Sequence, residues 1–214
     1  MCTPVNRILG GRRYYSGAMV SSSPGRPVRL EAFGIVLREY MPRDEPDLLL
    51  AFADEEIARW NPGPPGPDAV AEFVRLRNDW SGNDHASWVM ADASDRLVGS
   101  VSLHKIDVDQ ADAEVGYWVA PWARRKGHAT AAVRAASRFG FGQLGLHRLQ
   151  LYHAADNPGS CAVASAAGFV HEGTLRKSFR YADGVYHDEH LHGLLAADIG
   201  PSGAMRGEPG RADC

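Results

Sequence analysis

The sequence predicts an α/β domain in which helices cover both faces of a mixed sheet. Helical and strand-like patterns alternate along its middle, and no internal repeat interrupts them. Hydrophobic residues make up 44% and charged residues 23% of the chain, a composition typical of globular domains. Both ends differ, because residues 1–27 and 200–214 mix Gly, Ser, Pro and Arg without periodicity. We therefore expect flexible tails there and one folded domain over residues 28–199.

A strand and two helices are expected first. Apolar residues over 33–38 predict the strand, and helical spacing predicts a helix over 44–60. The residues of that helix expected to face the core are Leu48, Leu49, Phe52 and Ile57. A loop rich in Pro and Gly covers 61–67, after which Asp68 is a suitable N-cap for a helix that runs to about Trp80.

Strands dominate the next part of the domain. Residues 87–91 and 97–105 predict a hairpin. The clearest strand is 113–119, because its residues alternate between two faces. One face carries Ala113, Val115, Tyr117 and Val119, and the other carries Glu114, Gly116 and Trp118.

Helices and strands alternate again toward the end of the domain. A helix begins at Gly127, and a strand covers 147–153. A short helix over 157–167 ends before Gly168, a residue typical of that position. The final strands form a hairpin that turns at 181–185.

A basic turn stands between the clearest strand and the helix that follows it. Its residues are Arg124, Arg125, Lys126, Gly127, His128, Ala129 and Thr130. Free backbone N–H groups at a helix N-terminus, together with the helix dipole, form an anion site. Gly127 lets a phosphate approach the backbone closely, and the three basic residues add positive charge. By itself, this short pattern is equally compatible with a basic surface turn that caps a helix.

Several motifs in order resemble one family. Gly116-Tyr117-Trp118-Val119, followed by Arg124-x-x-Gly127-x-Ala129, resembles the central motif of the GNAT superfamily, in the form found in RimJ/RimL-like N-acetyltransferases. Asn157-Pro158-Gly159-Ser160 and the segment from Gly168 to Gly173 resemble the motifs that follow in that family. The resemblance covers nearly all of residues 28–199.

The resemblance implies a GNAT fold, with a mostly antiparallel sheet that splays into a V and holds a thioester in its cleft. It implies that backbone groups of Trp118 and Val119 pair with pantetheine. It also implies that the N–H groups from Arg125 to Thr130 cradle a pyrophosphate, and that Asn157 and Ser160 contact the pantetheine arm or its thiol end. The expected reaction is transfer of an acetyl group from acetyl-CoA to a primary amine, either a protein N-terminus or a small molecule, by direct attack in a ternary complex.

Two residues are candidates for proton transfer. Glu114 is a candidate general base, directly or through water, although it could equally be a structural carboxylate. Ser160 is a candidate to assist the departing thiolate, although it could instead cap its helix, a role for which Asn157 competes. Tyr152 is a weaker candidate acid, because such a tyrosine more often packs in the sheet.

Acceptor recognition is assigned by the resemblance to two loops, over 61–67 and 180–186, and Trp60 beside the first could line an acceptor pocket. The alternative function is a non-catalytic acyl-CoA sensor with the same fold. A Rossmann-type nucleotide binder is not favoured, because the sequence has no G-x-G-x-x-G after an early strand.

No metal is expected. On a strand, His190 and His192 share one face while His187 lies on the other, so a zinc site would need ligands from elsewhere in the chain. The net charge of −3 gives no reason to expect nucleic-acid binding. No apolar run approaches the roughly 20 residues of a membrane helix, and no signal peptide is recognised, so we expect a cytoplasmic protein without a membrane partner. A homodimer is compatible with the resemblance.

Overall fold

The structure is a computed structural model that describes residues 25–64 and 66–199. Its elements are β1 (Leu30–Ala32), β2 (Ile35–Arg38), a 3₁₀ turn (Pro42–Asp44), α1 (Glu45–Phe52), α2 (Glu55–Trp60), α3 (Pro67–Asn78), β3 (His85–Ala91), β4 (Leu97–Asp107), β5 (Asp112–Val119), a 3₁₀ turn (Pro121–Ala123), α4 (His128–Gly142), β6 (Arg148–Ala154), α5 (Pro158–Ala166), β7 (Val170–Arg180), β8 (Tyr186–Leu195) and a 3₁₀ turn (Ala196–Asp198). The expected tails over residues 1–24 and 200–214 lie outside the described residues. Gly25, also assigned to the first tail, accepts a hydrogen bond from the backbone N–H of Trp80 at 3.2 Å.

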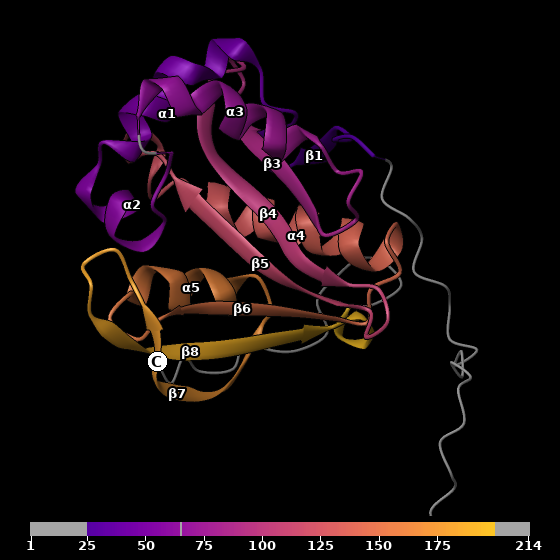
Figure 1. Ribbon diagram of the computed structural model, residues 1–214. Helices are drawn as coiled ribbons and strands as arrows, with labels where there is room; N and C mark the ends of the chain where they lie inside the picture. The colour runs from indigo at the N-terminus through magenta and orange to yellow at the C-terminus, as the bar shows by residue number, and fades with distance from the viewer. Residues whose placement is uncertain (1–24, 65, 200–214) are drawn as a thin grey trace, which may run out of the picture.

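The strands form one sheet in the order β1-β2-β3-β4-β5-β6-β8-β7 (Figure 1). Neighbouring strands are antiparallel except β5 and β6, which are parallel. Helices α4 and α5 pack on one face, and the α1–α3 segment packs on the other face of its first half. The predicted fold class, a mixed and mostly antiparallel sheet with helices on both faces, is confirmed. No helix in the described ranges has the length and apolar character needed to cross a bilayer.

Two apolar cores lie on the two faces of the sheet because side chains of a strand alternate. On β5, Ala113 and Val115 belong to the core beneath α4, whereas Trp118 belongs to the core beneath α1 and α3. The first core contains a cluster of edge-to-face aromatic rings, in which Trp88 lies 4.8 Å from Trp80 and 5.2 Å from Phe139, centroid to centroid. The two faces predicted for 113–119 are therefore confirmed.

The sheet parts between β5 and β6. The parallel ladder pairs Asp112–Glu114 with Arg148–Gln150, whereas β5 continues to Val119 and β6 to Ala154. Beyond Glu114, β5 is paired only with β4. Half of its backbone N–H and C=O groups therefore face the opening and need partners from elsewhere. The predicted V is confirmed, and Figure 1 shows it between β5 and β6.

Several details of the sequence prediction were wrong in the first half. The strand expected over 33–38 begins only at Ile35, as β2, because Gly34 adopts φ +74° and turns the chain from β1, leaving Phe33 93% exposed. The helix expected over 44–60 breaks before α2, where the Asp54 carboxylate accepts a hydrogen bond from the Ile57 N–H at 3.0 Å and starts a new helix.

Leu49, expected to face the core, is exposed, whereas Leu48 and Ile57 are buried as expected. In addition, Asp68 is not an N-cap. Helix α3 begins one residue earlier at Pro67, a residue favoured at the first helical position, so Asp68 lies in the first turn.

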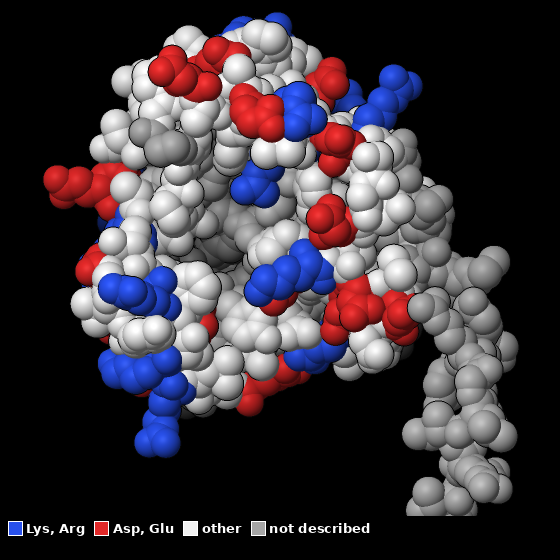
Figure 2. All heavy atoms as spheres, viewed as in Figure 1, with Lys and Arg blue, Asp and Glu red and all other residues white. Residues whose placement is uncertain are grey.

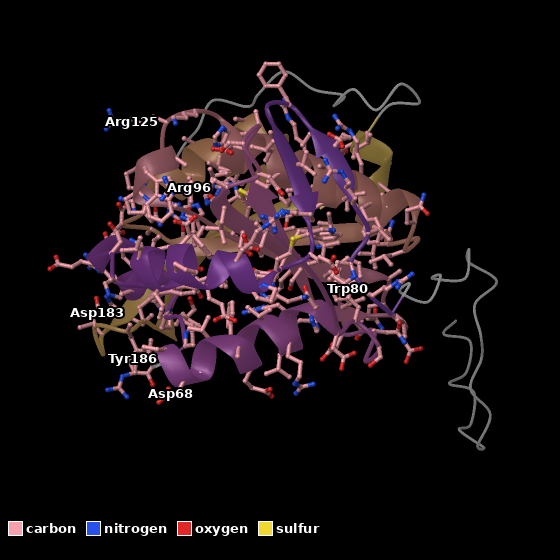
Figure 3. The ribbon with its side chains drawn as sticks, turned by 90° about the horizontal axis from the view of Figure 1, so that it is seen from above. Asp68, Trp80, Arg96, Arg125, Asp183 and Tyr186 are labelled. Carbon is pink, nitrogen blue, oxygen red and sulfur yellow. The ribbon has the colours of Figure 1, made fainter. Side chains whose placement is uncertain are left out.

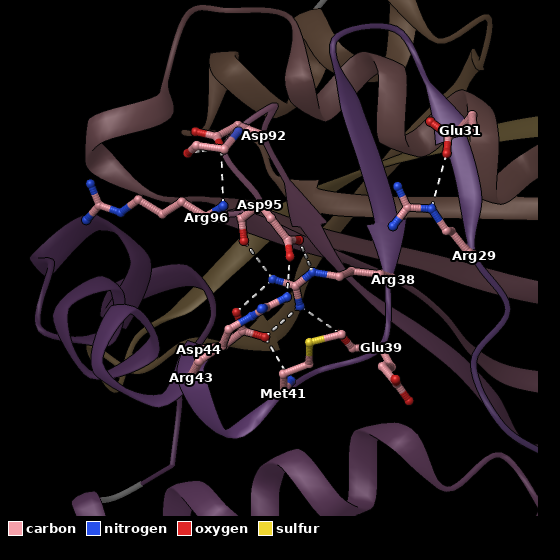
Figure 4. A network of polar contacts seen from close by, with 11 residues as sticks. Arg29, Glu31, Arg38, Glu39, Met41, Arg43, Asp44, Asp92, Asp95 and Arg96 are labelled. Atoms are coloured by element: carbon pink, nitrogen blue, oxygen red, sulfur yellow. Dashed lines mark hydrogen bonds and ion pairs between the residues drawn. The ribbon is translucent and has the colours of Figure 1, made fainter.

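A buried ion pair holds β2 to the segment before α1 (Figure 4). The Arg38 guanidinium donates to both Asp44 carboxylate oxygens, at 2.7 and 2.9 Å, and to Asp95 at 2.7 Å. Arg38 and Asp44 are only 3% and 2% exposed. Burial alone would lower the pKa of Arg38, but its hydrogen bonds to the two carboxylates raise it. The Arg38 guanidinium therefore stays charged inside the protein.

Candidate functional site

A cavity of 410 Å³ opens where β5 and β6 separate. Its lining includes all the residues that the sequence predicts for acetyl-CoA binding, which are Trp118, Val119, Arg124, Arg125, Lys126, Gly127, His128, Ala129, Thr130, Asn157 and Ser160. The remaining lining residues come from α2, α5 and three further places, which are Asn61 after α2, Tyr117 on β5 and Ala123 in the 3₁₀ turn. The fold thus brings the basic turn, the end of β5 and the start of α5 together around one space, which we call the donor cavity.

The N-terminus of α4 forms one wall of the donor cavity. No side chain caps this 15-residue helix, so its first N–H groups are available to an anion. Arg125 and Gly127 have positive φ values of 63° and 78°, the backbone conformation that curves successive N–H groups around an anion. A Cβ built on Gly127 would meet nothing within 4 Å. The space beside Gly127 is therefore open.

The charges of the basic turn have different partners. Arg124 is paired with Asp54 at 2.5 Å and with Glu56 at 3.0 Å, so its guanidinium ties the turn to α2 instead of standing free for a diphosphate. Arg125 and Lys126 are exposed, and Figure 3 shows Arg125 projecting outward from the body. Nδ1 of His128 is buried with no hydrogen-bond partner among the described residues, and burial lowers the pKa of this imidazole. A neutral His128 can donate a hydrogen bond to a phosphate oxygen.

Asn157 and Ser160 form the opposite wall of the donor cavity. The Asn157 side chain caps α5 by accepting from the Ser160 N–H at 3.1 Å, so Asn157 and not Ser160 is the helix cap. The Ser160 hydroxyl instead accepts a hydrogen bond from the phenol of Tyr117 at 3.0 Å. Burial raises the pKa of Tyr117 to about 12, which keeps the phenol protonated at neutral pH. Tyr117 was missed as a site residue because its strand position indicated only packing.

A second cavity of 500 Å³ shares Trp60, Asn61, Tyr117 and Trp118 with the donor cavity, and we call it the acceptor cavity. Its other lining residues are Tyr40, Phe52, Pro62, Phe73, Arg77, Ser100, Ser102, His104, Gly116, Phe179, Arg180, Tyr181 and Ala182. The structure places Trp60 and parts of both predicted acceptor loops here. The face drawn in Figure 2 is hollowed near its centre, with basic side chains around the hollow.

Glu114 does not line the acceptor cavity itself but contacts His104, which does. Its carboxylate accepts from Lys105 Nζ at 2.8 Å and lies 3.4 Å from Nε2 of His104. Burial would raise the pKa of Glu114, but the contacts with His104 and Lys105 outweigh burial and lower it. His104 lines the acceptor cavity, whereas Glu114 is absent from the linings of the cavities described here. The cross-strand pairing of His104 with Glu114 could have identified this histidine, had the register of the two strands been known.

Gly116 makes room for His104. A Cβ on Gly116 would lie 2.9 Å from Cε1 of the imidazole. A glycine inside a strand indicates that another group approaches the backbone closely. Gly116 was therefore a second feature of the sequence that could have indicated a side chain such as His104 at this place. Tyr152, the weaker candidate acid, donates to Gln150 at 2.6 Å and lines a small cavity of 70 Å³ that also includes Ser160.

The family comparison decides the identity of the domain. A protein-family model described as an acetyltransferase (GNAT) domain matches residues 35–170. The chain belongs to the GNAT acetyltransferase family. The match spans the sheet from β2 to the start of β7, and therefore includes the parted strands, the basic turn and the whole of α5.

Individual GNAT proteins resemble parts of the chain. The putative ribosomal N-acetyltransferase YdaF of Bacillus subtilis is 38% identical over 99 residues, which are 46% of this chain and 54% of that protein, so the chain matches about half of that relative's length. The structure of a spermidine N-acetyltransferase from Vibrio cholerae in complex with CoA and spermine has a TM-score of 0.67 and 26% identity, covering 77% of this chain and 97% of that one. Mycobacterium smegmatis RimJ in complex with CoA-disulfide has a TM-score of 0.73 at 22% identity, with 85% and 92% covered, and shows the likeness of the fold.

Proposed function

We propose that this protein transfers the acetyl group of acetyl-CoA to a primary amine by direct attack in a ternary complex. The observation that supports this most is the meeting of two cavities at Tyr117 and Trp118, where β5 leaves β6. One cavity has an anion-binding helix terminus for a diphosphate, and the other has space for an acceptor. A thioester in the donor cavity would then face the acceptor across the backbone of β5.

In this proposal the donor is held mainly by backbone. N–H groups from Arg125 to Thr130 bind the pyrophosphate, and Arg125 and Lys126 add charge that water partly screens. Pantetheine amides pair with the unpartnered edge of β5 at Trp118 and Val119, where a ladder strand is missing. Asn157 keeps the start of α5 in place beside the thiol end.

The chemistry requires two proton transfers. The amine nitrogen attacks the thioester carbonyl carbon, the C–S bond breaks, and the amine loses a proton. We assign that proton to His104, which lines the acceptor cavity, with Glu114 orienting the imidazole. The departing thiolate takes a proton from Ser160, whose hydroxyl is resupplied by the Tyr117 phenol. Glu114, predicted as the base itself, thus acts through His104.

Replacing His104 by glutamine is expected to lower kcat by at least about a hundredfold, the usual contribution of a positioned base. Glu114→Gln is expected to lower kcat less, because His104 stays in the acceptor cavity but loses the carboxylate that orients its imidazole. Steady-state rates measured with a saturating amine check both. His147→Gln, at an exposed position outside these cavities, is the matched control. An unchanged kcat for Glu114→Gln removes Glu114 from the mechanism.

The lining of the acceptor cavity supports a particular class of amine. Aromatic rings from α1, α2, α3 and the last hairpin cover much of it, and its basic residues are Arg77 and Arg180. None of its described lining residues is Asp or Glu. A polyamine would bring several positive charges to a space without a carboxylate, and like charges cost several kcal/mol. We therefore propose an acceptor with one amine and an apolar or anionic group next to it.

The charge of the group next to the acceptor amine is expected to determine kcat/KM. A peptide that begins Phe-Glu should have a kcat/KM at least about tenfold above one that begins Phe-Lys and above spermidine, since tenfold requires only 1.4 kcal/mol. Arg180→Gln should narrow the difference between the two peptides, whereas Arg176→Gln, on exposed β7 outside the cavity, should not. Thiol release from acetyl-CoA measures all of these. A preference for spermidine would contradict the assignment of acceptor class.

Thiol release from acetyl-CoA in the presence of an amine panel also tests the activity itself. Release that depends on an amine, with acetylated amine detected by mass spectrometry, is the expected result. Tight CoA binding without release for any amine would favour the alternative of a non-catalytic acyl-CoA sensor. A cytoplasmic location and a homodimer stay predictions.

A further inference from the structure

Four histidines from three strands meet on one face of the sheet, and none of them lines the donor or the acceptor cavity, although His153 also lines the 70 Å³ cavity beside Ser160. His153 is on β6, His171 on β7, and His190 and His192 on β8. The antiparallel register pairs His153 with His190 and His171 with His192. Because Leu151 is the cross-strand partner of His192, the four rings share the face that carries buried leucines of β6 and β8.

The rings are packed closely enough to share a ligand. The His153 ring centroid lies 5.3 Å from that of His190 and 5.1 Å from that of His192. The His171 centroid lies 4.9 Å from His190 and 5.2 Å from His192. One ring nitrogen from each of His153, His190 and His192 lies within 4.8 Å of the others. Four nitrogens bound at about 2.0 Å to a tetrahedral zinc ion lie about 3.3 Å apart, so side-chain rotations would close the site.

Two of these rings each have a buried nitrogen without a hydrogen-bond partner among the described residues, and a third directs a lone pair toward its neighbour in the cluster. Nδ1 of His153 donates to the carbonyl oxygen of Ala154 at 2.8 Å, so the lone pair is on Nε2, which lies 3.1 Å from Nε2 of His192. Nε2 of His171 and Nδ1 of His190 are buried, and neither has a hydrogen-bond partner among the described residues. An unsatisfied buried polar atom costs free energy, so both atoms favour a ligand between the strands.

The chemistry of the cluster favours a metal ion over an anion. His192 is fully buried and His153 is 5% exposed. Metal ions bind the neutral imidazole ring through a nitrogen lone pair. Imidazole donors suit zinc and its neighbours in the transition series better than calcium or magnesium.

We propose that His153, His171, His190 and His192 form a binding site for a divalent transition-metal ion of the zinc class. Four protein ligands leave no open coordination position, so the ion is structural and joins the edge strand β7 to β6 and β8. The sequence predicted no metal, because His190 and His192 needed ligands from elsewhere. The register of β6, β8 and β7 supplies these ligands. His187, the third histidine of that run, is instead held by Asp183 at 2.8 Å and Asp156 at 3.2 Å.

Cobalt substitution tests the site without reference to activity. The full-length protein is stripped of metal with a chelator and titrated with Co²⁺. The expected result is the intense visible absorption of tetrahedral Co²⁺ at one ion per chain, lost on addition of Zn²⁺. At a hundredfold excess over its Kd, Zn²⁺ should raise the midpoint of thermal unfolding by about 5 °C. Absence of the tetrahedral spectrum overturns the proposal, because the His153–His192 contact at 3.1 Å would then be a simple hydrogen bond.

A substitution at the edge strand identifies the ligands. His171→Cys keeps a metal ligand, and it should add a thiolate-to-cobalt charge-transfer band in the near ultraviolet. His171→Asn should weaken Co²⁺ binding at least tenfold. His147→Cys and His147→Asn, at an exposed position outside the cluster, should do neither. If His171→Asn proves unfolded, the charge-transfer band of His171→Cys decides the matter, and its absence in a folded protein that binds Co²⁺ excludes His171 as a ligand.

Discussion

Replacing Asp44 by alanine is expected to lower the free energy of unfolding by about 3 to 5 kcal/mol, because it leaves the buried Arg38 guanidinium without its main counter-charge. Asp44 accepts two hydrogen bonds from Arg38 and a third from the Met41 N–H at 2.8 Å, so the variant also frees a backbone donor. For a domain of this size, the midpoint of thermal unfolding should fall by about 10 °C. Thermal and urea unfolding measure both quantities.

The matched control is Glu31→Ala, which breaks an ion pair at the surface. Arg29 and Glu31 lie 3.2 Å apart, and their side chains are 61% and 73% exposed. Water screens such a pair, so its loss should change the free energy of unfolding by about 0.5 kcal/mol or less. Equal effects of the two substitutions would show that the Arg38–Asp44 pair is not protected from solvent.

Replacing Gly127 by valine is expected to weaken CoA binding by about thirtyfold. A β-branched residue at φ +78° carries backbone strain of about 2 kcal/mol, and the turn can relax when no ligand holds it. CoA binding would force the strained conformation, so the cost is expressed in the Kd. Calorimetric titration with CoA measures the effect.

Gly34→Val is the control for backbone strain alone. Gly34 has φ +74°, and a Cβ built on it also meets nothing within 4 Å, yet it lies in the β1–β2 turn away from both cavities. The substitution should therefore lower stability and leave the Kd for CoA unchanged. A similar loss of CoA affinity in both variants would mean that the effect at Gly127 comes from general destabilisation.

The fold and the donor cavity could be predicted largely because their signals are local. The alternation over 113–119, the glycine at the start of α4 and the Asn157–Ser160 segment each determine one element and its end. The hairpin at Gly34 and the break at Asp54 were missed because each depends on one residue that overrides a longer pattern. Asp54 stabilises the break with its own side chain and then binds Arg124 from 70 residues further along the chain.

Contacts between residues that are far apart in the chain could not be predicted from the sequence. Tyr117 donates a hydrogen bond to Ser160 because β5 packs near the start of α5. His104 meets Glu114, and the four histidines come together, because of strand register and the order of β6, β8 and β7. The same limit applies to Arg124, whose charge was assigned to the diphosphate but is paired with α2. Local patterns identify which residue types are present, whereas register decides which of them meet.

The central claim is that the cavity between β5 and β6, walled by the start of α4, binds acetyl-CoA. Calorimetric titration of the protein with CoA tests it most directly, with 3′-dephospho-CoA and pantetheine as comparison ligands. We predict saturable binding of one CoA per chain at micromolar concentration, little change without the 3′-phosphate, and a large loss without the diphosphate. Absence of CoA binding at millimolar concentration, or equal binding of pantetheine and CoA, would contradict the claim.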